Sequence, residues 1–309
     1  MRRIRLFTSI AAVLALTMLA CGGDTTPRSN GTSTPTGTGA GISTVSIGQC
    51  QTAQGTQAPA AKKDVPYQQQ LKQPGRLHVG SDNAYPPFEE IKPGTKNPVG
   101  FDVDLYTEVA KRLGLTVVST TTDFDGLFTQ SIPTGQLDIG VSAITIKEER
   151  KKTVDFTVPY FQADLSLAIN SALTPTIKTV DDLAGRTIGA QKATTGEDCA
   201  KFLVSQGKGK EVKSFDDAAV AFQDLVAGRV AAIVNDRPAS EGFIQKNASL
   251  KVVQVIRTQE QYGFAISKDK PDLREAINAK LLEIMKDGTY ATIYKKWFET
   301  EPPFPVPLS

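Results

Sequence analysis

The residues that point most clearly to chemistry are Arg150 and Thr145, which stands five positions earlier. An arginine guanidinium keeps its charge and donates two parallel hydrogen bonds to a carboxylate, which a flexible lysine does less well. The threonine-rich turn Lys192–Glu197 precedes a predicted helix, and free backbone N–H groups at a helix start favour an anion. Arg150, Thr145 and the pair Thr194 and Thr195 therefore predict a site that holds a carboxylate.

Two acidic residues follow other predicted strands, where they suit a positively charged group. Asp82 comes directly after the strand LHVGS, with Tyr85 on the stiff Pro-Pro loop that follows, and Asp236 comes after VAAIV and Asn235. A carboxylate that faces an anion-binding site across two lobes would meet an ammonium group. This pairing is the recognition pattern of an α-amino acid.

Each of these residues also has a structural interpretation, which the sequence leaves open. Arg150 belongs to the charged run KEERKK, which is typical of a solvated helix surface. Thr194 suits a helix N-cap, Asp236 a helix cap and Asp82 a turn, while Phe124 suits a core position.

Strands and helices alternate along residues 77–298, the pattern of an α/β protein with parallel sheets. One set of predicted elements runs through LHVGSD, GFDVDLYTEVAKRLG, LTVVST and DIGVSAITI, and a second set runs from VDDLAGR to VAAIVND. Two β-type runs, residues 163–170 and 260–267, bracket the second set and predict the hinge of an inserted lobe. Because ligands bind beyond the carboxyl ends of strands in such sheets, the candidate residues are expected to converge there.

The N-terminus has the pattern of an export signal. Arginines at positions 2, 3 and 5 precede an apolar run, residues 10–20, that is short for a membrane span. The run ends in Ala20-Cys21, which resembles a bacterial lipobox, although Met18 and Leu19 depart from its commonest form. We therefore expect residues 1–21 to be a lipoprotein signal peptide with Cys21 lipidated, and a secreted soluble protein is the alternative.

Residues 22–72 are rich in Gly, Ser, Thr, Pro and Gln and are expected to be a disordered linker between the anchor and the folded part. Cys50, in this segment, and Cys199, in the folded part, are eligible for a disulfide in an oxidising compartment. Two independent thiols remain the alternative, because spacing alone does not supply the geometry of a bridge.

The composition limits the class of partner. The 309 residues are 40% hydrophobic and 22% charged with a formal net charge of +2, which suits a globular protein with a sizeable core. So balanced a charge does not favour a nucleic-acid surface, and no nucleic-acid partner is expected.

Residues 76–303 resemble the bacterial extracellular solute-binding proteins for polar amino acids, the family of the glutamine-, histidine- and lysine/arginine/ornithine-binding proteins. The resemblance rests on seven motifs in order: SDNAYPPFE, VGFDVDLYTEVAKRLG, SAITIKEERKKTVDFTVPY, KATTGE, IVNDRP, EQYGFAI and DGTYATIYKKWF. It implies a two-lobed α/β fold of the periplasmic-binding-protein type II, with the first lobe in residues 73–166 plus 264–305 and the second in 167–263. It also implies a monomeric, lipid-anchored extracytoplasmic receptor that delivers its ligand to an ABC transporter permease, without a cofactor or a metal.

The resemblance also implies a role for each site residue. Arg150, Thr145 and the Thr195 backbone amide would hold the ligand carboxylate, and Asp236 and the Ala143 carbonyl would hold the ammonium. Tyr85 and Phe124 would pack on either side of the ligand's aliphatic stem. The part of the pocket that holds the ligand's side-chain end would be lined by Asp82, Ser142, Gln191 and Asn235.

The ligand is expected to be glutamine or a basic amino acid such as arginine or lysine, with glutamine slightly preferred. Gln191 and Asn235 stand where the glutamine-binding relative has Lys and His, so an acidic side chain would face Asp82 without a cation. Lys192 would change this expectation if its ammonium pointed into the cleft. Two other functions stay open, a cyclohexadienyl or arogenate dehydratase on a similar scaffold and a sensory domain, but a binding protein rather than an enzyme is expected.

Overall fold

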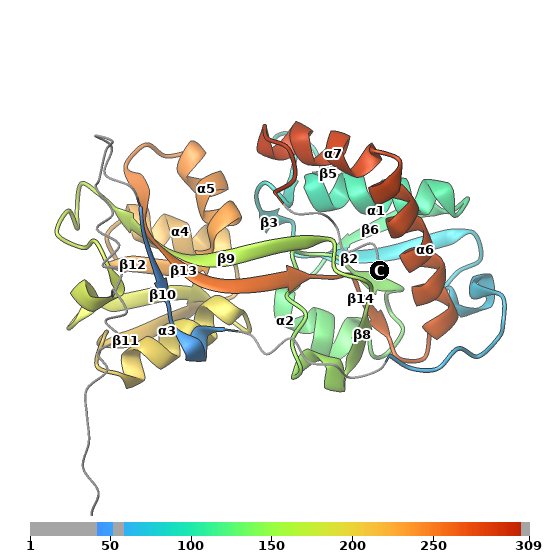
Figure 1. Cartoon of the computed structure of the whole chain (residues 1–309), viewed down its shortest axis with the longest axis horizontal. Coiled ribbons are helices and arrows are strands. Elements are labelled where there is room, and N and C mark those ends of the chain that lie inside the picture. The colour runs from blue at the N-terminus through green and yellow to red at the C-terminus, as the bar shows by residue number, and fades with distance from the viewer. Residues whose placement is uncertain (1–41, 52–58, 304–309) are drawn as a thin grey trace, which may run out of the picture. The chain divides into compact units, whose positions relative to one another are not determined.

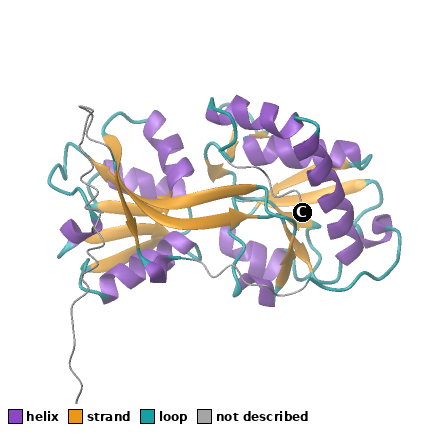
Figure 2. Ribbon diagram, in the orientation of Figure 1, coloured by secondary structure: helices purple, strands orange, loops and turns teal. Residues whose placement is uncertain are grey.

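A computed structural model describes residues 42–51 and 59–303, which form two lobes, each with a central sheet flanked by helices (Figures 1 and 2). The expected two-lobed α/β fold is therefore present. The first lobe has a five-stranded sheet in the order β6-β2-β7-β14-β8. Its strands are β2 (Arg76–Ser81), β6 (Thr116–Thr121), β7 (Ile139–Gly140), β8 (Val154–Phe156) and β14 (Ala265–Ser267), and its helices are α1 (Phe101–Arg112), α2 (Phe124–Gly126), α6 (Pro271–Lys286) and α7 (Thr289–Phe298).

The second lobe has a six-stranded sheet in the order β1-β13-β9-β12-β10-β11. Strand β10 is parallel to β11 and β12, whereas β9 is antiparallel to β12 and β13. The strands are β1 (Ser43–Ser46), β9 (Phe161–Asn170), β10 (Thr187–Gln191), β11 (Glu211–Phe215), β12 (Ala232–Asp236) and β13 (Leu250–Tyr262), and the helices are α3 (Thr195–Ser205), α4 (Ala218–Val226) and α5 (Arg237–Gln245).

A small sheet lies beside α1 and shapes the entry to that helix. It consists of β3 (Ala84–Tyr85), β4 (Glu89–Ile91) and β5 (Pro98–Val99). Gly100 precedes α1 with φ of 149°, and a Cβ there would stand 1.9 Å from the Phe88 carbonyl oxygen. Glycine is therefore required for the chain to pass so close to the β4 segment before the helix begins.

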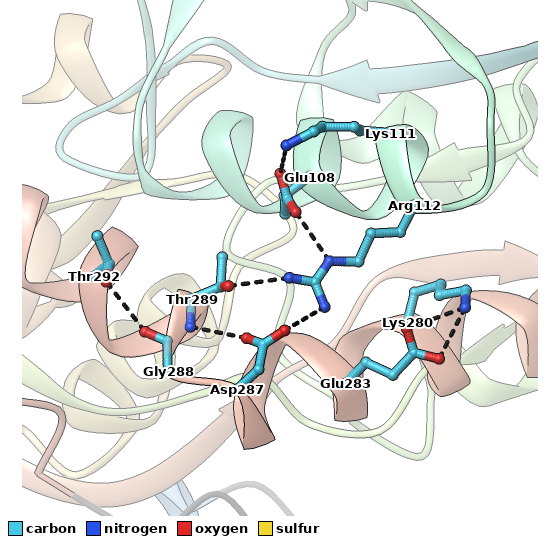
Figure 3. A network of polar contacts seen from close by, with 9 residues as sticks. All are labelled: Glu108, Lys111, Arg112, Lys280, Glu283, Asp287, Gly288, Thr289 and Thr292. Carbon is cyan, nitrogen blue, oxygen red and sulfur yellow. Dashed lines mark hydrogen bonds and ion pairs between the residues drawn. The ribbon is translucent and has the colours of Figure 1, made fainter.

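A polar network fixes the far end of α1 to the junction of α6 and α7 (Figure 3). The Arg112 guanidinium donates to Glu108 at 2.9 Å, to Asp287 at 2.6 Å and to the Thr289 hydroxyl at 3.0 Å. The hydrogen bonds from Arg112 and Thr289 lower the pKa of Asp287 to about 2. Helices α1, α6 and α7 are thus joined by polar contacts as well as by their apolar packing.

Two paired strands cross between the lobes, as Figure 1 shows for β9 and β13. Their pairing reaches from Leu250 opposite Asn170 to Tyr262 opposite Phe161. The predicted hinge run 163–170 corresponds to β9. The run 260–267 is not one strand, because the chain leaves β13 at Tyr262 and enters the first-lobe sheet as β14 at Ala265.

The expected disordered linker at 22–72 is wrong for the residues of it that the structure describes. Ser43–Ser46 form β1, which pairs in parallel with β13, and Cys50 is bonded to Cys199 on α3 with a Cα–Cα distance of 4.6 Å. Residues 59–72 lie against the first lobe, where Ala60 N–H donates to Asp155 and the Tyr67 hydroxyl donates to the Leu113 carbonyl. Strand pairing, a covalent bond and side-chain anchors order a segment whose composition lacks a core of its own.

The predicted signal peptide and Cys21 lie outside the described residues. Among residues 42–51 and 59–303, no helix has the length and apolar character needed to cross a membrane.

Candidate functional site

A small polar cavity lies between the two lobes, at the carboxyl ends of β2, β10 and β12. Its position follows the rule that ligands bind beyond the carboxyl ends of strands in α/β sheets. Both lobes contribute to its lining, which consists of Asp82, Tyr85, Phe124, Ser142, Ala143, Thr145, Arg150, Gln191, Thr194, Thr195 and Asp236. The structure thus brings together every predicted site residue except Asn235.

Arg150 is 5% exposed and lines the cavity, so it is not a solvated member of the KEERKK run. Its guanidinium donates to the Thr145 carbonyl at 2.8 Å and to the Ala193 carbonyl at 2.9 Å. The group also lies over the rings of Phe124 and Phe128, with centroid distances of 5.1 and 4.7 Å, as a cation over aromatic faces. Burial lowers the pKa of Arg150 to about 10, which leaves the group charged at neutral pH.

A buried glutamate, Glu260, lies next to this cation and was not predicted. Its Oε2 accepts from the Thr145 hydroxyl at 2.6 Å and from the Thr195 hydroxyl at 2.9 Å. Burial, with the nearby charge of Asp236 as a second cause, raises the pKa of Glu260 to about 8. The motif EQYGFAI contained the only available signal, an acidic residue in a β-type run.

Asp236 is the acceptor at another part of the cavity. Its Oδ2 accepts from the Tyr85 hydroxyl at 2.8 Å and from the Tyr262 hydroxyl at 2.7 Å. Burial raises the pKa of Asp236, whereas these two hydrogen bonds and Arg150 lower it. Asn235 is not among the residues that line the cavity; its Oδ1 accepts from the Tyr85 hydroxyl at 2.9 Å, behind the lining.

Asp82 faces Gln191 across the cavity. The Gln191 Nε2 donates to Asp82 Oδ2 at 2.8 Å and to the Asp216 carbonyl at 3.1 Å. Burial raises the pKa of Asp82 to about 6, against the effect of the Gln191 hydrogen bond. Lys192 does not line the cavity, since its ammonium lies 3.1 Å from Asp125 and its side chain is half exposed.

Two buried carboxyl groups support Ser142 and Ala143 from the protein side. The Ser142 hydroxyl donates to Glu89 at 2.5 Å, and the Ala143 N–H donates to Asp102 at 2.8 Å. Ala143 has φ of 46°, a left-handed conformation that is unusual for a residue other than glycine. The bond to Asp102 fixes this conformation, which sets the positions of the Ser142 and Ala143 groups that line the cavity.

Thr194 has the structural role that the sequence left open, and it also lines the cavity. Its hydroxyl accepts from the Glu197 N–H at 3.1 Å, which caps α3, and donates to the Gln191 carbonyl at 2.7 Å. The start of α3 therefore presents Thr195 to the cavity with its backbone N–H in the first turn of the helix.

A wider hollow lies elsewhere between the lobes, but its lining is mostly apolar. Phe222 and Phe243 stack there with ring centroids 4.2 Å apart, and Lys246 forms an ion pair with Glu90. The smaller cavity is the better candidate, because it gathers charged groups and hydroxyls from several strand ends.

Two lobes joined by a crossing pair of strands, with a charged cavity lined from both, define the class of two-lobed binding proteins. The family model for bacterial extracellular solute-binding proteins, family 3, matches residues 77–300. The chain belongs to this family.

Individual relatives support the same family. The L-cystine-binding protein TcyJ of Escherichia coli strain K12 is 33% identical over 229 residues, which cover 74% of this chain and 84% of the relative. The arginine-, lysine-, histidine-binding protein ArtJ from Geobacillus stearothermophilus is 35% identical with a TM-score of 0.68, covering 74% of this chain and 97% of ArtJ. An ancestral arginine-binding protein bound to arginine is 38% identical with a TM-score of 0.68, covering 72% of this chain and 98% of that protein.

Proposed function

We propose that the protein binds a basic L-amino acid, with arginine as the first candidate, and delivers it to an ABC transporter permease. The observation that carries the proposal is the charge of the cavity lining, which has one cation, Arg150, and two carboxylates, Asp82 and Asp236. Arginine, lysine and ornithine have the opposite set, one carboxylate and two positive groups.

The carboxylate of the ligand belongs with Arg150. The guanidinium is held by two backbone carbonyls and by two aromatic rings, so its position does not depend on a protein carboxylate bonded to it. The Thr145 hydroxyl and the Thr195 N–H complete this end of the site. Hydrogen bonds to charged groups contribute about 1.5–3 kcal/mol each.

The ammonium belongs with Asp236 and the Ala143 carbonyl. Asp236 already accepts from two tyrosine hydroxyls, which orient its carboxylate without neutralising it. The stem of the ligand lies between Tyr85 and Phe124, which line the cavity in the first lobe.

The side chain of the ligand belongs with Asp82. A guanidinium or ammonium group of the ligand would compensate the negative charge of Asp82, which burial disfavours. The amide of a glutamine ligand would only replace the hydrogen bond that Gln191 donates to Asp82. Lys192 pairs with Asp125 outside the cavity and does not favour an acidic ligand. We therefore place arginine and lysine before glutamine, in contrast to the slight preference from the sequence. The names of ArtJ and of the ancestral protein support arginine.

Binding is coupled to hinge motion along β9 and β13. The ligand docks on the first lobe, and contacts from Thr195 and Asp236 of the second lobe favour the form in which the lobes are together. To shift such an equilibrium from 1:99 to 99:1 takes about 5.5 kcal/mol, which a few charged hydrogen bonds supply.

The receptor acts outside the cytoplasm as a monomer, attached to the membrane through lipidated Cys21. The signal-like residues 1–21 support this location, and the Cys50–Cys199 disulfide fits an oxidising compartment. The part of residues 22–72 that precedes β1 is the tether.

A thermal-shift screen with the twenty amino acids and cystine, followed by calorimetry, tests the proposed ligand class. Arginine and lysine should raise the melting temperature most, because a ligand of the native state stabilises it by mass action. A response to glutamate or aspartate without one to arginine, lysine, histidine or glutamine would refute the argument from Asp82. Turnover of prephenate or arogenate without tight amino-acid binding would favour the dehydratase instead.

A further inference from the structure

Glu260 joins three parts of the molecule through one oxygen atom. The residue lies on the crossing strand β13, Thr145 follows β7 in the first lobe, and Thr195 begins α3 in the second. Both threonine hydroxyls lie within hydrogen-bond distance of Glu260 Oε2, at 2.6 and 2.9 Å, and Glu260 is fully buried. The same two threonines line the cavity beside Arg150.

This arrangement conflicts with the binding of a second carboxylate. A threonine hydroxyl has a single hydrogen to donate. While the Thr145 and Thr195 hydroxyls donate to an ionised Glu260, neither hydroxyl can donate to the carboxylate of an amino acid. The second carboxylate would also stand close to the charge of Glu260, and like charges at short range are costly.

The charged surroundings of Glu260 make its protonation depend on the ligand. Arg150 is the cation that faces Glu260, and Asp236 is a neighbouring anion. After burial and Asp236, the charge of Glu260 also raises the pKa of the Tyr85 and Tyr262 hydroxyls. Arg150 favours the ionised form of Glu260 in the free protein. A ligand carboxylate at Arg150 offsets that effect and adds a negative charge.

We propose that the carboxylate of the amino acid binds at Arg150 together with the protonated form of Glu260, so that an ionised Glu260 takes up a proton from solvent on binding. The neutral carboxyl group then donates its O–H to one of the two threonine oxygens, and that hydroxyl turns its hydrogen to the ligand while the other threonine still donates to Glu260. No bond other than these hydrogen bonds and the O–H bond of Glu260 changes. Glu260 is thus a positioning residue, and the inference rests on the proposed amino-acid function.

The direction of the pH dependence follows from this linkage. Burial and Asp236 raise the pKa of Glu260 to about 8, and the bound ligand raises it further. Glu260 therefore does not limit binding well below pH 8 but weakens it above pH 8, where the proton must be taken from a more basic solution. The loss is about tenfold between pH 7 and pH 9 for a single group that must be protonated.

Calorimetric titration of the protein with arginine at pH 8, in two buffers of different ionisation enthalpy, counts the protons taken up. At pH 8, which equals the pKa of Glu260 in the free protein, we expect wild type to take up about half a proton per arginine bound. Glu260→Gln should lose this uptake and retain only the small uptake that the ligand's own amino group causes in both proteins. Glu241→Gln, an exposed carboxylate on α5 that pairs with Arg237, is the matched control and should behave as wild type.

Each outcome decides the inference. Arginine binding without proton uptake in wild type, or with the same uptake in Glu260→Gln, overturns it and leaves the proposed function intact. Failure of every amino acid to bind removes the proposed function itself. If Glu260→Gln does not fold, as judged by circular dichroism, the wild-type proton count at pH 8 and the loss of affinity between pH 7 and pH 9 still decide.

Discussion

Gln191 donates from its side-chain amide to the Asp82 carboxylate at 2.8 Å, across the boundary between the two lobes. One amide from the second lobe thus satisfies part of a buried carboxylate of the first. Because an amide carries no charge, it leaves the negative charge of Asp82 uncompensated. The pair therefore marks the part of the cavity where a cationic side chain gains most.

Asp82→Asn should separate a basic ligand from glutamine. Loss of one charged hydrogen bond of about 1.5–3 kcal/mol corresponds to a roughly 10- to 100-fold weaker affinity for arginine. Glutamine affinity should change by less than about threefold, since an asparagine can still bond an amide. Calorimetry with both ligands measures the difference, and an equal loss for both would place the side-chain end elsewhere.

Arginine binding should also weaken in acid because of Asp82. Its pKa is raised to about 6 by burial, and a cation beside it lowers that pKa in the complex. Binding therefore releases a proton near pH 6, so that the contribution of Asp82 to affinity is fully present above this range and is lost as the pH drops through it. The expected loss is about tenfold between pH 7 and pH 5. Asp82→Asn is the control and should remove this acid limb of the pH profile.

Arg150→Ala should abolish tight binding of every amino acid. Removing one partner of a buried, hydrogen-bonded charge pair costs about 2–5 kcal/mol, which is at least a roughly 30-fold loss of affinity. Arg150→Lys keeps the charge but lacks the planar fork, so its affinity should lie between those of wild type and Arg150→Ala. Unchanged affinity in the alanine variant would show that the carboxylate site has been misplaced.

Reduction of the Cys50–Cys199 disulfide should destabilise the protein. The bridge closes a loop with a sequence separation of 149 and holds the segment that contains β1 to α3. Its loss should lower the free energy of unfolding by about 2–4 kcal/mol, measured by urea denaturation with and without reductant.

The double variant Cys50→Ser/Cys199→Ser is the control for this experiment. It should unfold like the reduced wild type and should not respond to reductant. A wild-type transition that reductant leaves unmoved would contradict the stabilising role of the bridge.

The alternation of strands and helices predicted the two sheets, because that pattern is local and is repeated along the chain. The strand ends predicted most of the cavity, since Asp82, Gln191 and Asp236 directly follow or end short strands. The linker was wrong at Ser43–Ser46, because the strand forms by pairing with a segment more than 200 residues away. Asn235 was expected to line the cavity, but its side chain contacts Tyr85.

The sequence by itself determined the family, the order of the elements and the types of groups that meet a ligand. The tertiary structure decided how those groups share their hydrogens and charges. It buried Arg150 over two aromatic rings, directed Lys192 to Asp125 and placed both threonine hydroxyls on Glu260. The reason is physical: a residue type sets which charge and donors are available, but pKa values and hydrogen-bond partners depend on burial and on neighbours that folding brings together.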